Sequence, residues 1–191
     1  SIAVSAARRG HAREILEKLG CEPDLPIVAF GCGSTNSRAK RWPAERFASL
    51  ASQVIDLAGA NIVLLGSEDE SEVADKVKSL SGRDLINAVG RTSLEEAVAL
   101  LAVADVFVSN DMGLAHIAAA VGTPTLVIFG PTDPETTRPF SDVAEVIRVP
   151  VECSPCMLRD CPIDHRCMTA IEPAAIAARV VDILKQEASN G

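Results

Sequence analysis

The sequence contains no long apolar segment and no excess of basic residues. Its longest apolar stretch, residues 97–108, is interrupted by Asp105 and is shorter than the roughly 18 residues that a membrane-spanning helix needs. The formal net charge is -8, whereas a nucleic-acid surface requires a basic face. We therefore expect neither a transmembrane segment nor nucleic-acid binding.

The first residues also lack the features of an export signal. Residues 1–9 have no adequate apolar core, so we expect a cytoplasmic protein in a reducing compartment. The chain does not begin with methionine, and we expect it to be a piece of a longer protein. With 191 residues, of which 48% are hydrophobic, it can bury one good core, and a single domain is the default.

Three familiar site motifs are absent. No Gly-Lys-Ser/Thr sequence occurs, which excludes a Walker phosphate-binding loop. The Gly31-Cys32-Gly33 segment is not a dinucleotide fingerprint, because Asn36 occupies the position of the third glycine. No Gly-x-Ser-x-Gly elbow is present, so nothing supports hydrolase chemistry.

Short apolar strands alternate with amphipathic helices along the chain. Most of these strands are apolar throughout, which is typical of a parallel sheet covered on both faces in right-handed βαβ units. We predict an α/β fold with a Rossmann-like, doubly wound parallel sheet over residues 26–187, preceded by a connector helix and linker (1–25) that lies on a surface outside the core. The predicted strands are 27–30, 61–65, 85–89, 106–108, 125–129 and 145–149.

The stretch from Val106 to Asp133 reads as strand, tight loop, helix and strand. Asn110 and Asp111 are good N-cap residues. The free N–H groups of a helix start favour an anion, and Gly113 removes the side chain that would keep a phosphate away. His116 lies one turn further on, on the same side as Gly113. We predict a phosphate-bearing ligand here, although Asp111 could be only a cap and His116 only a packed residue.

Other loops meet this helix start at the same sheet edge, where ligands of such folds bind. The loop 31–42 carries three basic residues, and its lysine, Lys40, could contact a diphosphate; such residues are also common on solvated surfaces. The loop 66–70 is acidic, which suits ribose hydroxyls but also favours a helix N-terminus. Residues 130–133 form a weaker candidate. Together these loops describe a nucleotide-diphosphate site.

Four of the six cysteines crowd into fifteen residues. The insert 153–168 contains Cys153, Cys156, Cys161 and Cys167, with His165 among them. This spacing could hold a structural zinc ion, while reduced thiols and local disulfides remain alternatives. We expect none of these thiols to be catalytic.

Several motifs in this order resemble glycosyltransferase family nine, the ADP-heptose:lipopolysaccharide heptosyltransferases. The resemblance covers residues 26–187, and the cysteine-rich insert is similar to the heptosyltransferase II branch. The motifs are Lys40-Arg41-Trp42-Pro43, Leu65-Gly66-Ser67 with Glu70, Asn110 to His116, and Phe129 to Pro134.

The resemblance implies the carboxyl-terminal half of a GT-B enzyme, which binds the nucleotide sugar. Acceptor recognition and the general base would belong to the missing amino-terminal half, so no catalytic residue is expected in this chain. The resemblance assigns the donor diphosphate to Lys40 and to the backbone of Met112 and Gly113, with Asp111 and His116 beside it. It assigns the ribose to Glu70, and the adenine to the backbone of Arg91 and Thr92.

The expected activity is transfer of heptose, with inversion, from ADP-heptose to the lipopolysaccharide inner core. ADP-heptose is a substrate, and we expect no cofactor and no catalytic metal. The protein would work in the cytoplasm, with a peripheral association at the inner face of the membrane. The isolated chain should bind nucleotide without transferring sugar. The alternatives are a GT-B transferase that uses another nucleotide sugar and a non-catalytic nucleotide-binding module.

Overall fold

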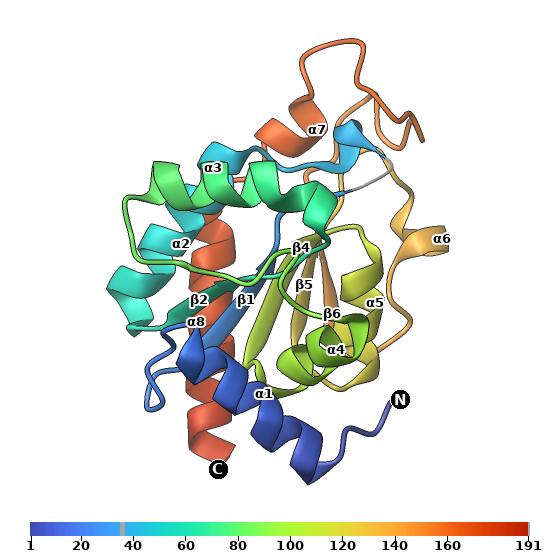
Figure 1. Cartoon of the computed structure of the whole chain (residues 1–191). Coiled ribbons are helices and arrows are strands. Elements are labelled where there is room, and N and C mark those ends of the chain that lie inside the picture. The colour runs from blue at the N-terminus through green and yellow to red at the C-terminus, as the bar shows by residue number, and fades with distance from the viewer. Residues whose placement is uncertain (35–36, 191) are drawn as a thin grey trace.

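The computed structural model describes residues 1–34 and 37–190, built around a six-stranded sheet (Figure 1). The strand order is β3-β2-β1-β4-β5-β6, and every neighbouring pair runs parallel. The predicted α/β class with a doubly wound parallel sheet is confirmed. The strands are β1 (Ile27–Gly31), β2 (Asn61–Leu64), β3 (Ile86–Asn87), β4 (Val106–Asn110), β5 (Thr125–Ile128) and β6 (Ala144–Ile147).

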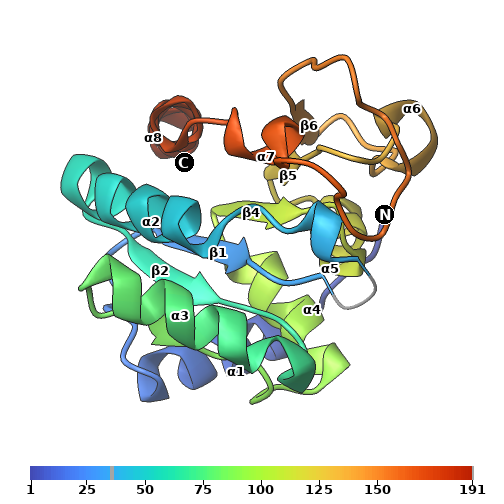
Figure 2. The same cartoon turned by 90° about the horizontal axis from the view of Figure 1, so that it is seen from above.

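Helices cover both faces of the sheet, as Figure 2 shows from above. Apolar side chains of α2, α3 and α8 pack on one face, and those of α1, α4 and α5 on the other. β1 and β4 are fully buried, which explains why β1 and the first three residues of β4 are apolar without alternation. The helices are α1 (Ala6–Lys18), α2 (Ala44–Ala58), α3 (Ser71–Ser81), α4 (Leu94–Val103), α5 (Gly113–Ala120), α6 (Pro134–Thr137), α7 (Arg166–Thr169) and α8 (Pro173–Asn190).

The strand order places the switch point of the sheet between β1 and β4. From β1 the chain winds outward through β2 to β3, and it then returns to β4 and winds the other way. The loops after β1 and β4 therefore diverge at the carboxyl edge and leave a crevice, where such folds bind ligands. Thr35 and Asn36, within the predicted basic loop, lie outside the described residues.

Local signals explain where several helices begin and end. Ser93 and Glu96 form the predicted capping box at the start of α4, with Ser93 N–H donating to Glu96 Oε2 over 2.7 Å. Gly122 follows α5 with a φ of 89°, the left-handed conformation that favours glycine. Pro173 opens α8 as predicted. β3 is shorter than the predicted strand 85–89, and the short helices α6 and α7 were not predicted.

The connector helix is part of the core, which corrects the expectation that it lies on a surface outside it. Ala12 and Leu16 on α1 are fully buried, in the apolar cluster that also contains Leu101 of α4 and Phe107 of β4. The helix therefore covers apolar surface of this domain. Among the described residues, no helix is long and apolar enough to cross a membrane.

Candidate functional site

An open pocket of about 340 Å³ lies at the carboxyl edge of the sheet, near the switch point. It lies between the loop after β2, the residues before α4 and the first turn of α5. Four of the predicted donor-binding residues line it together. The lining residues are Gly66, Ser67, Glu70, Thr92, Ser93, Leu94, Ala97, Met112, Gly113, Leu114 and Ile117.

Glu70 is the one charged residue among the described residues that line this pocket, and its relative exposure is 3%. Its Oε2 accepts a hydrogen bond from Ser67 N–H over 2.9 Å, so one oxygen caps the turn before α3. Its Oε1 is buried and has no hydrogen-bond partner among the described residues. A side chain at Gly33 or Gly66 would overlap this carboxylate, and the two glycines thus make room for it.

The unpaired oxygen has a physical consequence. A buried acceptor without a partner costs free energy, so a ligand hydroxyl that reaches Oε1 would be favoured. The neighbouring Cys32 thiol adds no second negative charge beside Glu70, because its pKa is raised. Burial raises this pKa most, and the Glu70 carboxylate raises it further. Both interpretations of the acidic loop, as a helix cap and as a ligand acceptor, are compatible with this geometry.

The first turn of α5 borders the same pocket. Met112 is its N-cap residue, with an extended backbone and no side-chain cap. The expectation that Asn110 or Asp111 caps this helix is therefore wrong. Asn110 is the last residue of β4, and the Asp111 carboxylate bonds to Lys40 instead. Gly113 is exposed, and a Cβ there would meet no atom within 4 Å. The helix start is open to a ligand without side-chain obstruction.

Asp111 forms an ion pair with Lys40 that sequence reasoning did not foresee. Lys40 Nζ lies 2.8 Å from Asp111 Oδ2, and the Thr132 hydroxyl donates to the same oxygen over 2.8 Å. Asp111 is buried, whereas Lys40 retains a quarter of its side-chain exposure (26%). The pair brings a cation next to the start of α5, and together with Thr132 it joins three of the predicted loops.

Asn110 fixes the loop after β1 against β4. Its Oδ1 accepts from Trp42 N–H over 2.9 Å, and its Nδ2 donates to the carbonyls of Cys32 and Gly33. A buried side-chain amide that satisfies three backbone groups holds the basic loop in place. In the sequence, the only signal for this role of Asn110 is that it follows an apolar strand.

The other four predicted residues are not among those that line the pocket; they are Lys40, Arg91, Asp111 and His116. Thr92 lines it, whereas Arg91 is exposed and does not. His116 is exposed on α5, and Ile117 lines the pocket in its place beside Gly113. The donor contacts of Arg91 and His116 stay predictions. Leu114 and Ile117 were missed, although their apolar character in the first turns of a helix was a usable signal.

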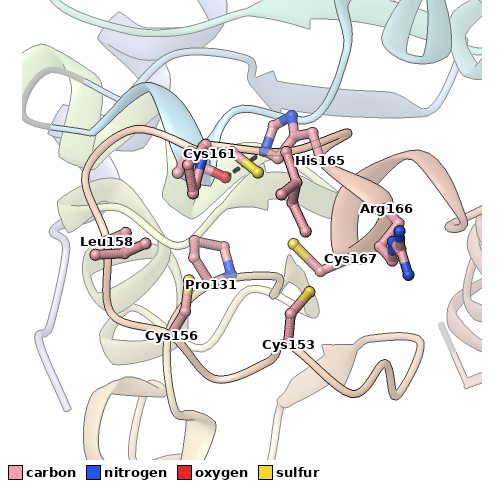
Figure 3. Close-up of a pocket in the computed structure, with 11 residues that line it drawn as sticks. Pro131, Cys153, Cys156, Leu158, Cys161, His165, Arg166 and Cys167 are labelled. Carbon is pink, nitrogen blue, oxygen red and sulfur yellow. Dashed lines mark hydrogen bonds between the residues drawn. The ribbon is translucent and has the colours of Figure 1, made fainter.

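The four cysteines of the insert surround a smaller cavity of about 70 Å³ beside Pro131 (Figure 3). All four are free thiols. Burial raises the pKa of the Cys167 thiol, and the other three cysteines raise it further. Among the described residues, no three histidine, cysteine or acidic side chains are arranged to share a metal ion.

Comparison with known proteins identifies relatives of this chain. The chain is 40% identical over 130 residues to lipooligosaccharide heptosyltransferase 2 of Haemophilus influenzae, which covers 66% of this chain and 37% of that protein. The structure of Escherichia coli ADP-heptose lipopolysaccharide heptosyltransferase II superposes with a TM-score of 0.82 and 29% identity, covering 98% of this chain and 54% of that one.

A further solved structure is similar to this chain. An E. coli heptosyltransferase with ADP-2-deoxy-2-fluoro heptose superposes with a TM-score of 0.63 and 25% identity, covering 90% of this chain and 47% of that one. This chain spans between about a third and about half of the length of these relatives. The model of glycosyltransferase family 9 (heptosyltransferase) matches residues 2–166. The chain belongs to glycosyltransferase family 9, the heptosyltransferases.

Proposed function

We propose that this chain is the donor-binding part of an enzyme that transfers heptose from ADP-heptose to the lipopolysaccharide inner core. The observation that carries the proposal is the pocket between the Glu70 carboxylate and the first turn of α5. It combines an acceptor suited to ribose hydroxyls with a helix start suited to phosphate. The related heptosyltransferase with a bound ADP-2-deoxy-2-fluoro heptose supports the choice of donor.

The donor diphosphate would lie against the amides of Met112 and Gly113. These amides belong to the first turn of α5, where N–H groups lack intrahelical partners. Asp111 directly precedes them and holds the Lys40 ammonium nearby, so helix dipole and cation act on the same anion. Asp111 itself would be repelled by a diphosphate, and we assign it to holding Lys40 rather than to the donor.

The same groups would assist the chemistry. When the sugar–phosphate bond breaks, negative charge builds on the departing diphosphate, and preorganised amides and a cation stabilise that charge. Inverting transfer also needs a base that takes the acceptor proton, and we place that base, with the acceptor site, in the remainder of the protein. We propose no cofactor, since ADP-heptose is a substrate.

The proposed acceptor also bears on location. A lipopolysaccharide acceptor is anchored in a membrane by its lipid, whereas ADP-heptose is a soluble nucleotide sugar. We therefore propose a cytoplasmic enzyme that meets its acceptor at the inner face of the membrane. Co-sedimentation of the full-length protein with acceptor-containing vesicles, but not with plain phospholipid vesicles, would support this location.

Calorimetric titration of this chain with ADP, UDP and ADP-heptose tests the donor assignment. The proposal predicts that ADP and ADP-heptose bind and that UDP binds more weakly. Preference for UDP would point to another nucleotide sugar. Binding to none of them, in this chain and in the full-length protein, would overturn the proposal. Binding without transfer by any full-length form would indicate a nucleotide-binding module.

A further inference from the structure

The cysteine-rich insert contacts two of the loops that build the site. In Figure 1 it stands at the carboxyl end of the sheet, over the segment that carries Lys40. Its residues 153–168 bond to the short 3-10 helix Arg38–Lys40 (η1) on one side and to residues 130–131 on the other. The insert is far from both loops in sequence, so these contacts are a product of the fold.

On the first side, the insert holds both backbone polar groups of Ala39, the residue before Lys40. The Ala39 N–H donates to Arg159 O over 2.9 Å. The Ala39 carbonyl lies 2.6 Å from His165 Nε2 (Figure 3). Because a carbonyl oxygen can only accept, Nε2 carries the proton of this imidazole. The backbone that presents Lys40 is thus fixed from the insert.

On the second side, the insert holds the loop that carries Thr132. Pro131 O accepts from the N–H groups of Cys156 and Met157 over 3.0 and 2.8 Å. A side chain at Gly130 would collide with Met168, the last residue of the insert. Thr132 follows directly and donates to Asp111.

The two sides meet at one atom. Lys40 and Thr132 both bond Asp111 Oδ2, while the insert bonds the residues that precede each of them. His165 also adopts a left-handed backbone, with a φ of 58°, which a non-glycine residue rarely does. Such a conformation persists where its surroundings enforce it, and here it directs the imidazole at Ala39.

We propose that the insert is a clamp for the donor site and that His165 is its positioning residue, acting on the donor diphosphate through Lys40. The inference rests on the proposed function, because it requires Lys40 to meet the diphosphate. A cation held in place before the ligand arrives loses less freedom on binding. Loss of the His165 bond would free the segment around Lys40 and weaken nucleotide binding without removing any group that touches the ligand.

The test compares two variants that differ in one hydrogen-bond donor. Glutamine can present an N–H near the position of Nε2, whereas methionine has a similar length and no donor. We expect His165→Met to weaken ADP binding by roughly 3- to 10-fold, the range of one hydrogen bond, and His165→Gln to restore most of it. Arg166→Gln is the control, since Arg166 pairs with Glu152 and Asp164 and not with either loop.

A double variant shows whether the effect passes through Lys40. In a Lys40→Ala background, His165→Met should have no further effect on ADP affinity. Equal losses in both backgrounds would overturn the proposal, as would unchanged ADP affinity in His165→Met. If His165→Met does not fold, His165→Asn replaces it, because asparagine tolerates the left-handed backbone but is too short to reach Ala39.

Two further results separate this inference from the proposed function. If the unmodified chain and the full-length protein bind no ADP, the proposed function fails, and the effects on affinity have no basis. If ADP binds and the His165 variants behave like the unmodified chain, only the clamp fails. Nitrogen NMR of the imidazole should show the proton on Nε2 in the neutral ring, and a proton on Nδ1 alone would contradict the assignment.

Discussion

Lys40 lies where a diphosphate and a buried carboxylate would share one ammonium group. Its replacement by alanine should weaken ADP binding about 10- to 100-fold, the range of a charged hydrogen bond. The Lys185→Ala variant, which changes an exposed lysine on α8, should leave calorimetric affinity unchanged. Equal affinities of Lys40→Ala and the unmodified chain would remove Lys40 from the site.

The Lys40→Ala variant also leaves Asp111 buried without its cation, which lowers stability. The combined Lys40→Ala and Asp111→Asn variant separates the two effects. It should regain thermal stability through the neutral amide but not ADP affinity. Recovery of affinity in this variant would show that the loss came from misfolding.

Glu70 is the residue that we expect to recognise the ribose. Its unpaired Oε1 would accept a ribose hydroxyl, so the chain should bind ADP about tenfold more tightly than an ADP that lacks the ribose hydroxyls. Glu70→Gln retains an oxygen for the Ser67 cap but weakens the acceptor, and should reduce this discrimination. Competition titrations measure the ratio of the two affinities. An unchanged ratio in Glu70→Gln would refute the proposed contact between Glu70 and the ribose.

Among the elements, α1 provides a direct test of where the domain begins. Leu16 is buried in the apolar cluster that also contains Leu101 of α4, and Leu16→Ala should lower the free energy of unfolding by about 2–5 kcal/mol. Leu57→Ala, on the exposed side of α2 (63% exposed), should change it by less than about 0.5 kcal/mol. Urea unfolding measures both. A small cost for Leu16→Ala would mean that α1 docks only loosely.

The contact between β6 and α8 should depend on pH. Arg179 donates hydrogen bonds to Glu145, which lowers the pKa of that carboxyl below its ordinary 4.5. A lowered folded pKa means that the stabilisation is present above the unfolded value and is lost as the pH falls through the folded value. Because Glu145 is 41% exposed, the pair should contribute less than about 1 kcal/mol.

Thermal melting of Glu145→Gln across a pH series checks this contribution. At pH 7 the variant should melt at most about 2–4 °C below the unmodified chain. The difference should shrink as the pH falls below 4.5 and vanish once the carboxyl is protonated. A difference that persists in acid would come from packing rather than from the ion pair.

For the whole molecule, the spacing of apolar residues, together with glycine, proline and capping residues, predicted the sheet and most helix positions. The apolar run 106–108 and the stop at Gly122 are local signals, and the parallel order follows from the alternation of such strands with helices. The connector helix was misplaced because the burial of Ala12 and Leu16 depends on α4, which lies far along the chain. A weak amphipathic pattern does not show which surface covers it.

The candidate site was predictable in its loops and not in its side-chain partners. Glu70, Met112 and Gly113 line one pocket because strand ends of a parallel sheet share an edge. The Lys40–Asp111 pair joins residues 71 positions apart, and the bond from His165 to Ala39 joins residues 126 positions apart. Such partners arise from three-dimensional packing, which spacing along the sequence does not encode.

The crystal structure of this chain with bound ADP would test the account most directly. The account predicts the diphosphate within hydrogen-bonding distance of the amides of Met112 and Gly113, with Lys40 beside it and the ribose at Glu70. ADP bound elsewhere, for example in the cleft of about 400 Å³ at the opposite edge of the sheet near Arg13 and Asp105, would contradict it.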